Sequence, residues 1–531
     1  MESDLVKKMV RGLERSAAYP HMVGNVKLLE THISWVFLTG DFAYKVKKPV
    51  DLGYLDYTSL EKRYYYCEME VRLNKLIAPE IYIGVVPITG VPECPMVEGN
   101  GPVIEYAVKM KEFPQKDILN LALARGEVPP SALDSFARDV AHFHANAPTP
   151  RLGASFGSPE TIKETTTQNF IKLLEASDFS KYKERVNTLF SITEKEFSLR
   201  VDDFENRRDN GFIREVHGDM HTGNMAFIDG KIIMFDRIEF NEPFRWIDVM
   251  SDTAFLVMDL MDRGYSGLSR KFLDSYLSAS GDYEGISVLR FYLSYRAMVR
   301  AKVALIRGGQ VDCDTQEDEA LKREFEQYLA MAERYMKPAK PILIITHGVA
   351  GCGKSTFAKL LIEETGAIVL RSDIERKRMF GMGSDEKRAE EIEEGLYAPE
   401  AIRKTYSRLE TLAGFIISAG FPVIVDATFL KHSWRDRFKH IAQERGVPFM
   451  ILDIQAPKAV LRNRVAKREF EGLDASDASL MVLEKQLMMD DGLMEDELAE
   501  TVVVDSLHMA DSVKEAVLEI EKVTGDVLVE G

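Results

Sequence analysis

The chain has 531 residues, 45% of them hydrophobic and 29% charged, with a formal net charge of −17; this length predicts about two to four globular domains, and the acidic balance argues against a broad surface for long nucleic acid. The four cysteines lie far apart without paired spacing, which argues against disulfides and a zinc site and predicts a reducing, cytoplasmic compartment. The opening segment is charged and no apolar run reaches about eighteen residues, so we expect neither a secretory signal nor a membrane-spanning helix.

The N-terminal part of the chain predicts a small β-rich lobe that carries one long helix. Alternating apolar residues indicate strands, and Gly40-Asp41 is a plausible hairpin turn between two of them. The predicted elements are a helix at Leu5–Leu13, strands at Ser34–Thr39 and Phe42–Lys47, a helix at Ser59–Leu76, and strands at Ile81–Pro87 and Val103–Met110 with turn-rich residues between them.

The middle of the chain is predicted to be mainly helical. Helical periodicity runs from Gln115 to Phe204 and continues up to Tyr335 after strand-like pieces within Ile213–Asp236. The segment Met336–Pro341 contains two prolines in six residues and is the best domain boundary. We therefore predict one domain over residues 1–336, with an N-lobe at about 1–110 and a C-lobe at about 111–336, and a second domain over residues 337–531.

The last part of the chain alternates between strand and helix patterns. This alternation predicts βαβ units and an α/β domain whose parallel sheet is covered on both faces. The candidate strands are Ile342–Thr346, Ile368–Arg371, Val423–Asp426, Phe449–Ile454 and Thr501–Asp505.

A phosphate-binding loop is predicted at Gly348–Thr356, GVAGCGKST, which follows an apolar strand and opens an apolar-periodic helix. Glycines allow a tight turn whose backbone N–H groups point at an anion. Lys354 brings a positive charge to the outer phosphates, and Ser355 offers a hydroxyl to Mg²⁺ at a helix N-terminus. The alternative is a glycine-rich turn that binds nothing. The residues assigned to the nucleotide are Gly348, Gly351, Gly353, Lys354, Ser355 and Thr356.

A polar segment, His217–Asn224, resembles the catalytic loop of aminoglycoside phosphotransferases and other protein-kinase-like enzymes, which reads H-G-D-x-H-x-x-N or H-R-D-x-x-x-x-N. The resemblance implies that Asp219 accepts the proton of the attacking hydroxyl and that Asn224 holds Mg²⁺. The alternative is a polar turn around a buried, hydrogen-bonded aspartate.

Asp236 supplies the second metal-binding aspartate that such a loop requires. Met225–Ile228 and Lys231–Phe235 predict strands joined by Asp229-Gly230, which is a strong two-residue hairpin signal. Closing this hairpin returns Asp236 to the neighbourhood of Asn224, so that both side chains could hold one ion.

A kinase-like site also requires a strand lysine that pairs with the ATP phosphates and with a helix carboxylate. Lys45 fits the A-x-K spelling, and Lys47 on the same strand face is its alternative. Glu70 in the predicted helix is the partner carboxylate, with Glu68 second. For each of these residues a solvated surface charge is the other interpretation. No glycine-rich loop precedes Lys45, so we expect phosphate cover from Thr31–Gly40 or weaker cover.

The resemblance narrows through three longer segments, FAYKVKKPVDLGYLDY, CEMEVRLNKLIAPEIYIGVVPI and FDRIEFNEPFRWIDVMSDTAFLVMDL. They are similar to one bacterial subfamily that couples an aminoglycoside-phosphotransferase-like domain to a P-loop kinase domain, over nearly the whole chain. The resemblance implies a two-lobed α+β kinase-like fold followed by an α/β P-loop domain with a parallel five-stranded sheet. Asp248 and Asp252 are expected to be structural residues that tie down the loop backbone.

Asp373 is the candidate general base of the P-loop domain, because it follows the predicted strand Ile368–Arg371. In P-loop kinases similar to zeta toxins and polynucleotide kinases, an aspartate at this strand end receives the acceptor hydroxyl. Asp373 would then lie within reach of a γ-phosphate held at Lys354. The alternative is that Asp373 is the N-cap of a helix over Ile374–Phe380.

Asp426 ends the apolar strand VIVD, which is the Walker-B arrangement for a residue directed at Mg²⁺. Farther on, Arg464 and Arg468 lie one helical turn apart, with Arg462 beside them. In this kinase class such arginines belong to a mobile lid that neutralises charge on the transferred phosphoryl group. The alternative is a solvated basic helix face.

These assignments favour a two-headed phosphotransferase that uses ATP and Mg²⁺ at both sites. Each domain would phosphorylate a hydroxyl of a small molecule or a nucleotide-type acceptor, without involvement of a membrane. The alternative is a single active P-loop kinase beside a nucleotide-binding regulatory or scaffolding domain, because the first domain lacks a glycine-rich loop. Aminoglycoside phosphorylation as antibiotic resistance is a further option that rests on fold analogy alone.

Overall fold

The computed structural model describes residues 2–175, 181–309, 315–337, 340–382, 398–471 and 480–525, without the side chains of residues 2–3 and 468–471. The chain divides into two compact units. The first comprises residues 1–136, 146–161 and 207–259, and the second comprises residues 137–145, 162–206 and 260–531. This division does not follow the proline-rich segment, so the predicted domain boundary at residue 337 stays a prediction.

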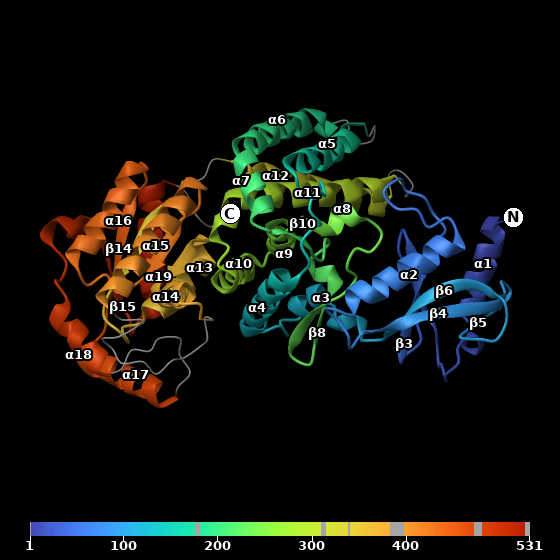
Figure 1. The fold of residues 1–531 in the computed structure, drawn as a ribbon, viewed down its shortest axis with the longest axis horizontal. Helices are drawn as coiled ribbons and strands as arrows, with labels where there is room; N and C mark the ends of the chain where they lie inside the picture. Colours follow the sequence, from blue (N-terminus) through green and yellow to red (C-terminus); the bar gives the residue numbers. More distant parts are fainter. Residues whose placement is uncertain are drawn as a thin grey trace. The chain divides into compact units, whose positions relative to one another are not determined.

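The N-terminal part of the first unit consists of α1 (Glu2–Leu13), η1 (Ser16–Ala18), β1 (Lys27–Glu30), β2 (Ser34–Leu38), β3 (Phe42–Lys47), α2 (Leu60–Asn74), β4 (Tyr82–Val91), β5 (Cys94–Val97) and β6 (Val103–Lys111). Its strands form one antiparallel sheet in the order β1-β2-β3-β6-β4-β5 (Figure 1). Helix α1 packs on one face through Met9 and Leu13, and α2 packs on the other through Cys67 and Val71.

The alternation of β3 explains why this sheet can carry a site. Tyr44 and Val46 point to the apolar core beneath α1, whereas Lys45 and Lys47 point to the opposite face, where each contacts Glu70 of α2. The short strand β5 was not predicted. Its residues appeared turn-rich, and only their pairing with the far end of β4 makes them a strand.

The remainder of the first unit contains η2 (Gln115–Asp117), α3 (Leu119–Ala124), β7 (Ile213–Glu215), η4 (Thr222–Asn224), β8 (Met225–Ile228), β9 (Lys231–Met234), α8 (Glu242–Arg245), β10 (Trp246–Asp248) and most of α9 (Val249–Asp262). Strand β10 lies in a stretch predicted to be helical, and it forms because it pairs with β7. Asp248 at its end binds Arg207 through both carboxylate oxygens, each at 2.7 Å, which is the structural kind of role expected of it.

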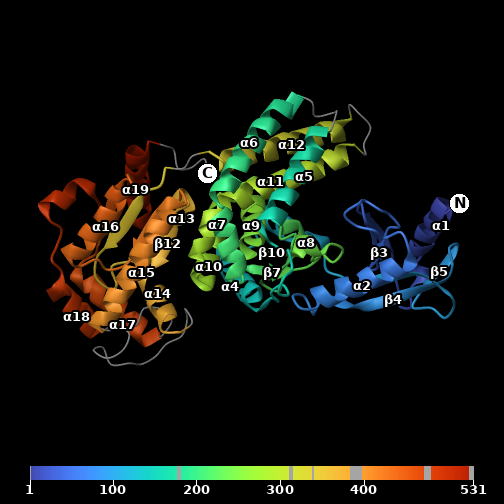
Figure 2. The same cartoon turned by 45° about the horizontal axis from the view of Figure 1, so that its top comes forward.

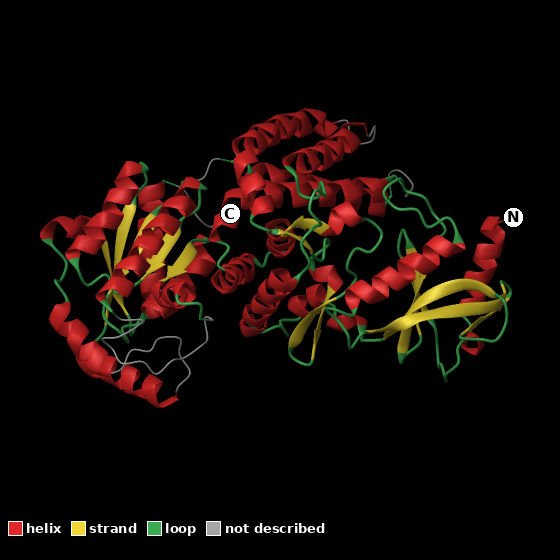
Figure 3. Ribbon diagram, in the orientation of Figure 1, coloured by secondary structure: helices red, strands yellow, loops and turns green. Residues whose placement is uncertain are grey.

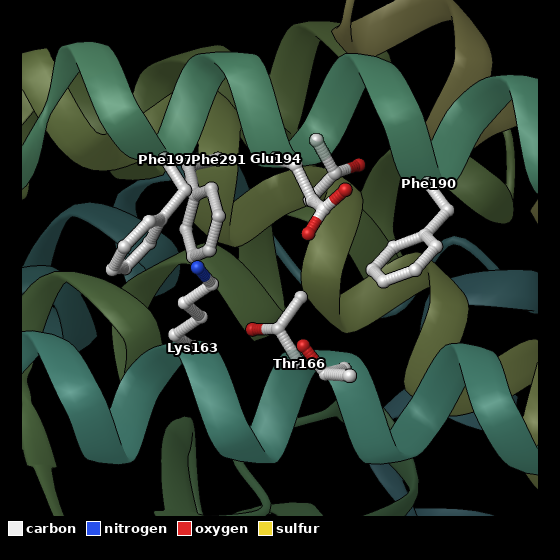
Figure 4. Close-up of a pocket in the computed structure, with 8 residues that line it drawn as sticks. Lys163, Thr166, Phe190, Glu194, Phe197 and Phe291 are labelled. Carbon is white, nitrogen blue, oxygen red and sulfur yellow. The ribbon is translucent and has the colours of Figure 1, made fainter.

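The helical part of the second unit contains α6 (Lys183–Leu199), α10 (Ser266–Ser280), η5 (Tyr283–Gly285), α11 (Ile286–Gly308) and α12 (Gln316–Tyr335). Helices α4 (Pro130–Asn146), α5 (Pro159–Glu175), α7 (Val201–Asp209) and α9 carry residues of both units. Figure 4 shows a small hollow between α5 and α6 that is lined by phenylalanine rings, including Phe190 and Phe197, and by Lys163. Among the described residues that line it, none is predicted for either site.

The rest of the second unit consists of β11 (Leu343–His347), α13 (Lys354–Thr365), β12 (Ile368–Arg371), α14 (Ser372–Met379), α15 (Pro399–Ser418), β13 (Val423–Asp426), α16 (His432–Glu444), β14 (Phe449–Gln455), α17 (Lys458–Glu471), α18 (Leu480–Met489), η6 (Glu495–Glu500), β15 (Thr501–Asp505) and α19 (Met509–Thr524). All five strands are parallel, in the order β12-β13-β11-β14-β15, with helices on both faces (Figure 3). Phe357 and Leu361 of α13 and Ile520 of α19 belong to the apolar core on one face. The predicted fold class is confirmed: a two-lobed α+β kinase-like fold precedes an α/β P-loop fold.

Candidate functional site

The predicted catalytic loop of the first unit lies between β7 and β8. The Asp219 side chain is 37% exposed, and its Oδ2 lies 3.4 Å from Nε2 of His221. The same Oδ2 accepts a hydrogen bond from Asn224 Nδ2 at 2.9 Å, and that nitrogen also donates to the Asp219 carbonyl oxygen at 3.1 Å. The loop therefore presents an accessible carboxylate and leaves the side-chain oxygen of Asn224 for another ligand.

Buried aspartates of α9 hold the backbone of this loop. Asp252 accepts hydrogen bonds from the backbone N–H groups of His217 at 3.0 Å and Gly218 at 2.9 Å. Asp259, which was not predicted, accepts from the backbone N–H of Thr222 at 2.8 Å and from its hydroxyl at 2.5 Å. Gly218 has a φ of +85°, and a Cβ there would lie 2.6 Å from a backbone carbonyl oxygen, so the second position of the H-G-D motif requires glycine.

The His217 imidazole is neutral and connects two backbone segments of the site. The carbonyl oxygen of Phe235 can only accept, so Nε2 of His217, 2.9 Å away, carries the proton. The backbone N–H of Asp219 can only donate, so Nδ1 accepts it at 3.3 Å. Burial lowers the pKa of His217, which favours this neutral form. His217 thus links the catalytic loop to the strand end that precedes Asp236.

The β8–β9 hairpin returns Asp236 to the loop as the Asp-Gly turn predicts. Met225 pairs with Met234, and the backbone N–H of Phe235 donates to the Asn224 carbonyl oxygen at 2.9 Å. Asp236 itself has a φ of +62°, a left-handed conformation that is costly for a residue with a Cβ. Such strain gathers at functional sites, and here it is held partly by the Tyr82 hydroxyl, which accepts the Asp236 N–H at 3.0 Å.

The two candidate lysines of β3 have different neighbours. Nζ of Lys45 lies 2.9 Å from Glu70 Oε1 and 2.5 Å from Asp236 Oδ1, so it joins the helix carboxylate to the predicted metal ligand. Lys47, 1% exposed, lies between Glu70 at 2.6 Å and Glu239. Although burial opposes it, Asp236 and Glu70 raise the pKa of Lys45. Burial also opposes the charge on Glu70, but the two lysines lower its pKa to about 2.

Sequence reasoning missed the partners that enclose Lys47. Tyr57 donates its hydroxyl to Glu239 at 2.5 Å, and both side chains are buried.

The turn of residues 31–34 joins β1 to β2, where a phosphate-covering loop was expected. It is closed by the Thr31 hydroxyl, which accepts the Ser34 N–H at 2.9 Å, and not by glycine. Burial and the charge of Lys48 lower the pKa of the His32 imidazole in this turn, although the charges of Asp219 and Asp236 oppose this shift.

The P-loop of the second unit connects β11 to α13. Gly348, Gly351 and Gly353 have φ values of +139°, +80° and +109°. A Cβ on Gly348 would lie 2.8 Å from the Ile454 carbonyl oxygen, which excludes other residues. Gly353 is the N-cap of α13, so Lys354 begins the helix and Thr356 lies exposed in its first turn. The loop therefore has the glycine-dependent turn that the motif GVAGCGKST predicts.

The residues predicted to hold the nucleotide and metal converge at the end of β13. Nζ of Lys354 donates to the Val349 carbonyl oxygen at 2.9 Å, within the P-loop. Burial raises the pKa of Asp426, whereas the charge of Lys354 and the nearby Ser355 hydroxyl oppose this rise. Ser355 and Asp426 thus offer adjacent hard oxygen ligands. That donor set fits Mg²⁺, which prefers few carboxylates together with phosphate oxygens and water.

Asp373 is the second residue of α14, and its side chain is 37% exposed. Its Oδ1 accepts a hydrogen bond from Arg376 one turn later. The alternative that Asp373 is a helix N-cap was wrong, because α14 begins earlier than predicted and Arg371 occupies the N-cap position. A base role for Asp373 stays a prediction.

Of the three arginines singled out in α17, Arg464 contacts the P-loop. Arg464 Nη1 donates to the carbonyl oxygens of Gly351 at 3.3 Å and Cys352 at 3.2 Å, so in this state its guanidinium supports the loop from outside. Arg462 pairs with Glu484 on the surface at 2.7 Å. The Arg468 side chain lies outside the described residues. The lid role of these arginines stays a prediction.

Comparisons with known proteins find similarity in the P-loop part and, more weakly, over most of the chain. Residues 343–490 match the family described as an AAA domain. Uncharacterized proteins of Mycobacterium bovis and Mycobacterium tuberculosis are 28% identical over 451 residues, which is 85% of this chain and 88% of each relative. A choline/ethanolamine kinase family protein from Mesorhizobium loti has a TM-score of 0.34 and 10% identity, covering 62% of this chain and 99% of that protein. A gluconokinase from Sinorhizobium meliloti has a TM-score of 0.26 and 20% identity, covering 35% and 95%.

The AAA match spans the P-loop and the strand that ends in Asp426. The match therefore supports a nucleotide-binding P-loop in this part of the chain. Of the helices in the described part of the chain, none combines the length and the apolar character that a bilayer crossing requires.

Proposed function

We propose that the chain is a two-headed phosphotransferase, in which each head transfers the γ-phosphate of ATP to a hydroxyl group in the presence of Mg²⁺. The observation that carries this proposal is the presence of two separate constellations. One joins Lys45 to Asp236 beside an accessible Asp219. The other brings Lys354 and Ser355, at the start of α13, near Asp426 at the end of β13.

In the first head, Asp219 would accept the proton of the acceptor hydroxyl, because its carboxylate is exposed and held by Asn224. Lys45, oriented by Glu70, would bind the phosphates once a nucleotide draws it from Asp236. The side-chain oxygens of Asn224 and Asp236 would hold Mg²⁺, which neutralises charge on the phosphates.

In the second head, the backbone N–H groups of the P-loop and Lys354 would bind the β- and γ-phosphates. Ser355 and Asp426 would hold Mg²⁺ there. Asp373 would accept the proton of the second acceptor, for which its ion pair with Arg376 would open. Arg464 and Arg468 would stabilise charge on the transferred group.

The acceptors are proposed to be small molecules that carry hydroxyl groups, including nucleotide ends. Long nucleic acid is a poor acceptor because the formal net charge of −17 repels its phosphates. The turn at residues 31–34 favours one alternative, in which the first head binds a nucleotide without chemistry, because this turn contains no glycine to approach the phosphates closely.

The test compares γ-phosphate transfer by the full chain and by Asp219→Asn, Lys354→Met and the double variant, across a pool of hydroxyl-bearing metabolites. We expect each single variant to lose one set of products and the double variant to lose both. Matched controls are Asp229→Asn in the β8–β9 turn and Lys359→Met on the exposed face of α13, which should keep all products.

The outcomes separate the two functions. If Asp219→Asn keeps every product of the wild type while Lys354→Met loses all of them, the first head is a passive nucleotide-binding domain. If neither variant changes any product, the proposed chemistry is wrong at both sites.

A further inference from the structure

Helix α10 contacts the P-loop fold within the second unit. Figures 1 and 2 show α10 beside α13, the helix that begins at Lys354. Nη1 of Arg270 donates to the carbonyl oxygens of Glu363 at 2.7 Å and Glu364 at 3.0 Å, in the last turn of α13. Because the last carbonyls of a helix lack partners within it, a buried guanidinium at this position stabilises the helix end. Helix α10 therefore supports the helix that carries the P-loop lysine.

The same helix binds the end of strand β12. Nη1 and Nη2 of Arg371 lie 3.1 Å and 2.8 Å from the two carboxylate oxygens of Asp274, and Nη1 donates to the Ser278 hydroxyl at 2.7 Å. The side chains of Arg371 and Asp274 are 11% and 9% exposed. A paired, bidentate contact away from water is the strong form of an arginine–carboxylate interaction, so Asp274 and Ser278 determine where this guanidinium points.

Arg371 also has a second carboxylate within its surroundings. It is the register partner of Asp426 across the parallel pair β12–β13, and register partners project their side chains from the same face of a sheet. Burial opposes the charge on Arg371, but Asp274 first, and Asp426 to a smaller extent, raise its pKa. Asp426 in turn is the carboxylate that lies near Lys354 and Ser355 of the P-loop. Two carboxylates thus compete for one guanidinium.

We propose that Asp274 is a positioning residue for the P-loop site, which holds Arg371 away from Asp426 and leaves that carboxylate to Ser355 and Mg²⁺. The inference rests on the proposed function of the P-loop head. An arginine paired with Asp426 would place a positive charge where the metal belongs and would occupy the oxygens that bind it. Residues that precede the predicted boundary at 337 would therefore control metal binding by the P-loop.

The experiment measures binding of a fluorescent ADP analogue to the full chain as Mg²⁺ is raised, and again with EDTA. The chain carries Lys45→Met and Asp236→Asn throughout, so that only the P-loop binds. In this background we expect Asp274→Asn to raise the Mg²⁺ concentration for half-maximal binding about tenfold, the equivalent of one charged hydrogen bond. Binding with EDTA should stay within about twofold, because no metal is displaced.

Rescue distinguishes competition from loss of structure. Adding Arg371→Gln to Asp274→Asn should restore the original Mg²⁺ dependence, because the intruding guanidinium is gone, and Arg371→Gln by itself should leave it within about twofold. The matched control is Lys271→Gln, which removes only the ion pair between α10 and Glu363 at 2.5 Å and should change neither curve.

Three results would overturn the inference. The first is an unchanged Mg²⁺ dependence in Asp274→Asn, and the second is a raised Mg²⁺ requirement in Asp274→Asn that adding Arg371→Gln does not rescue. The third is a raised Mg²⁺ requirement in Arg371→Gln alone, which can be measured even if Asp274→Asn does not fold. If the starting chain binds no nucleotide with or without Mg²⁺, the proposed function of the P-loop head is wrong, and this inference falls with it.

Discussion

Replacing Lys47 by methionine should destabilise the first head without removing the lysine that faces its site. Nζ of Lys47 lies 2.6 Å from Glu70 and also binds Glu239, and the exposed fractions of the two carboxylate side chains are 0% and 4%. Removing one member of a buried ion pair costs about 3–5 kcal/mol, because the remaining charge is left without compensation. Glu70 keeps Lys45 at 2.9 Å, so we expect the lower end of this range, about 3 kcal/mol.

The cost should depend on pH in a defined direction. Although burial opposes it, Lys45 and Lys47 lower the pKa of Glu70 to about 2 in the wild type. In Lys47→Met one of these two lysines is gone, so the pKa of Glu70 is lowered less and its charge stabilises the fold less above the unfolded pKa of about 4.3. The loss measured at about pH 7 should therefore shrink as the pH falls to about 3.

Hydrogen exchange in urea on peptides from β3 and α2 measures the local free energy of opening. The control is Lys62→Met, because Lys62 and its partner Asp56 have side chains that are 48% and 40% exposed, and such surface pairs contribute at most about 1 kcal/mol. A loss below about 1 kcal/mol for Lys47→Met, or an equal loss at both pH values, would refute the argument from buried charge.

Three further predictions concern other parts of the chain. Arg435 lowers the pKa of Glu497 to about 2, although burial opposes this shift. Glu497→Gln should therefore lower the free energy of unfolding by about 3 kcal/mol near pH 7. Urea titrations should show this loss disappearing as the pH falls from about 5 to 2, and a pH-independent loss would contradict the prediction. In the chain that carries Lys45→Met and Asp236→Asn, Gly348→Ala should abolish nucleotide binding at the P-loop, because the φ of Gly348 is +139° and its Cβ would meet a carbonyl oxygen at 2.8 Å. Retained affinity for a fluorescent nucleotide in that chain would show that the loop can deform. Asp252→Asn should lower transfer by the first head at least about tenfold, since it weakens the bond to the N–H of Gly218 that holds the loop; unchanged products from that head would make this bond dispensable.

Local spacing in the sequence was enough to predict much of the fold and the chemistry. The P-loop turn requires positive φ values at the glycines around Lys354, and glycine adopts them without steric cost. The P-loop could therefore be predicted from its own residues. Asp229-Gly230 similarly determines a hairpin, and the hairpin determines that Asp236 returns beside Asn224. The alternation of strand and helix patterns predicted a parallel sheet, although short strands such as Trp246–Asp248 were missed because their pairing partner lies far away in the chain.

Tertiary packing decided what spacing left open. Lys45 and Lys47 project from the same strand face and are equivalent in the sequence; the side chains of Asp236 and Glu239, about 190 residues farther on, distinguish them by contacting one each. Asp274 shows the same limit, since nothing in its own helix indicates an arginine on a distant strand. The cause is physical: strand and turn conformations depend on neighbouring residues, whereas the pairing of buried charges depends on which elements the apolar core brings together.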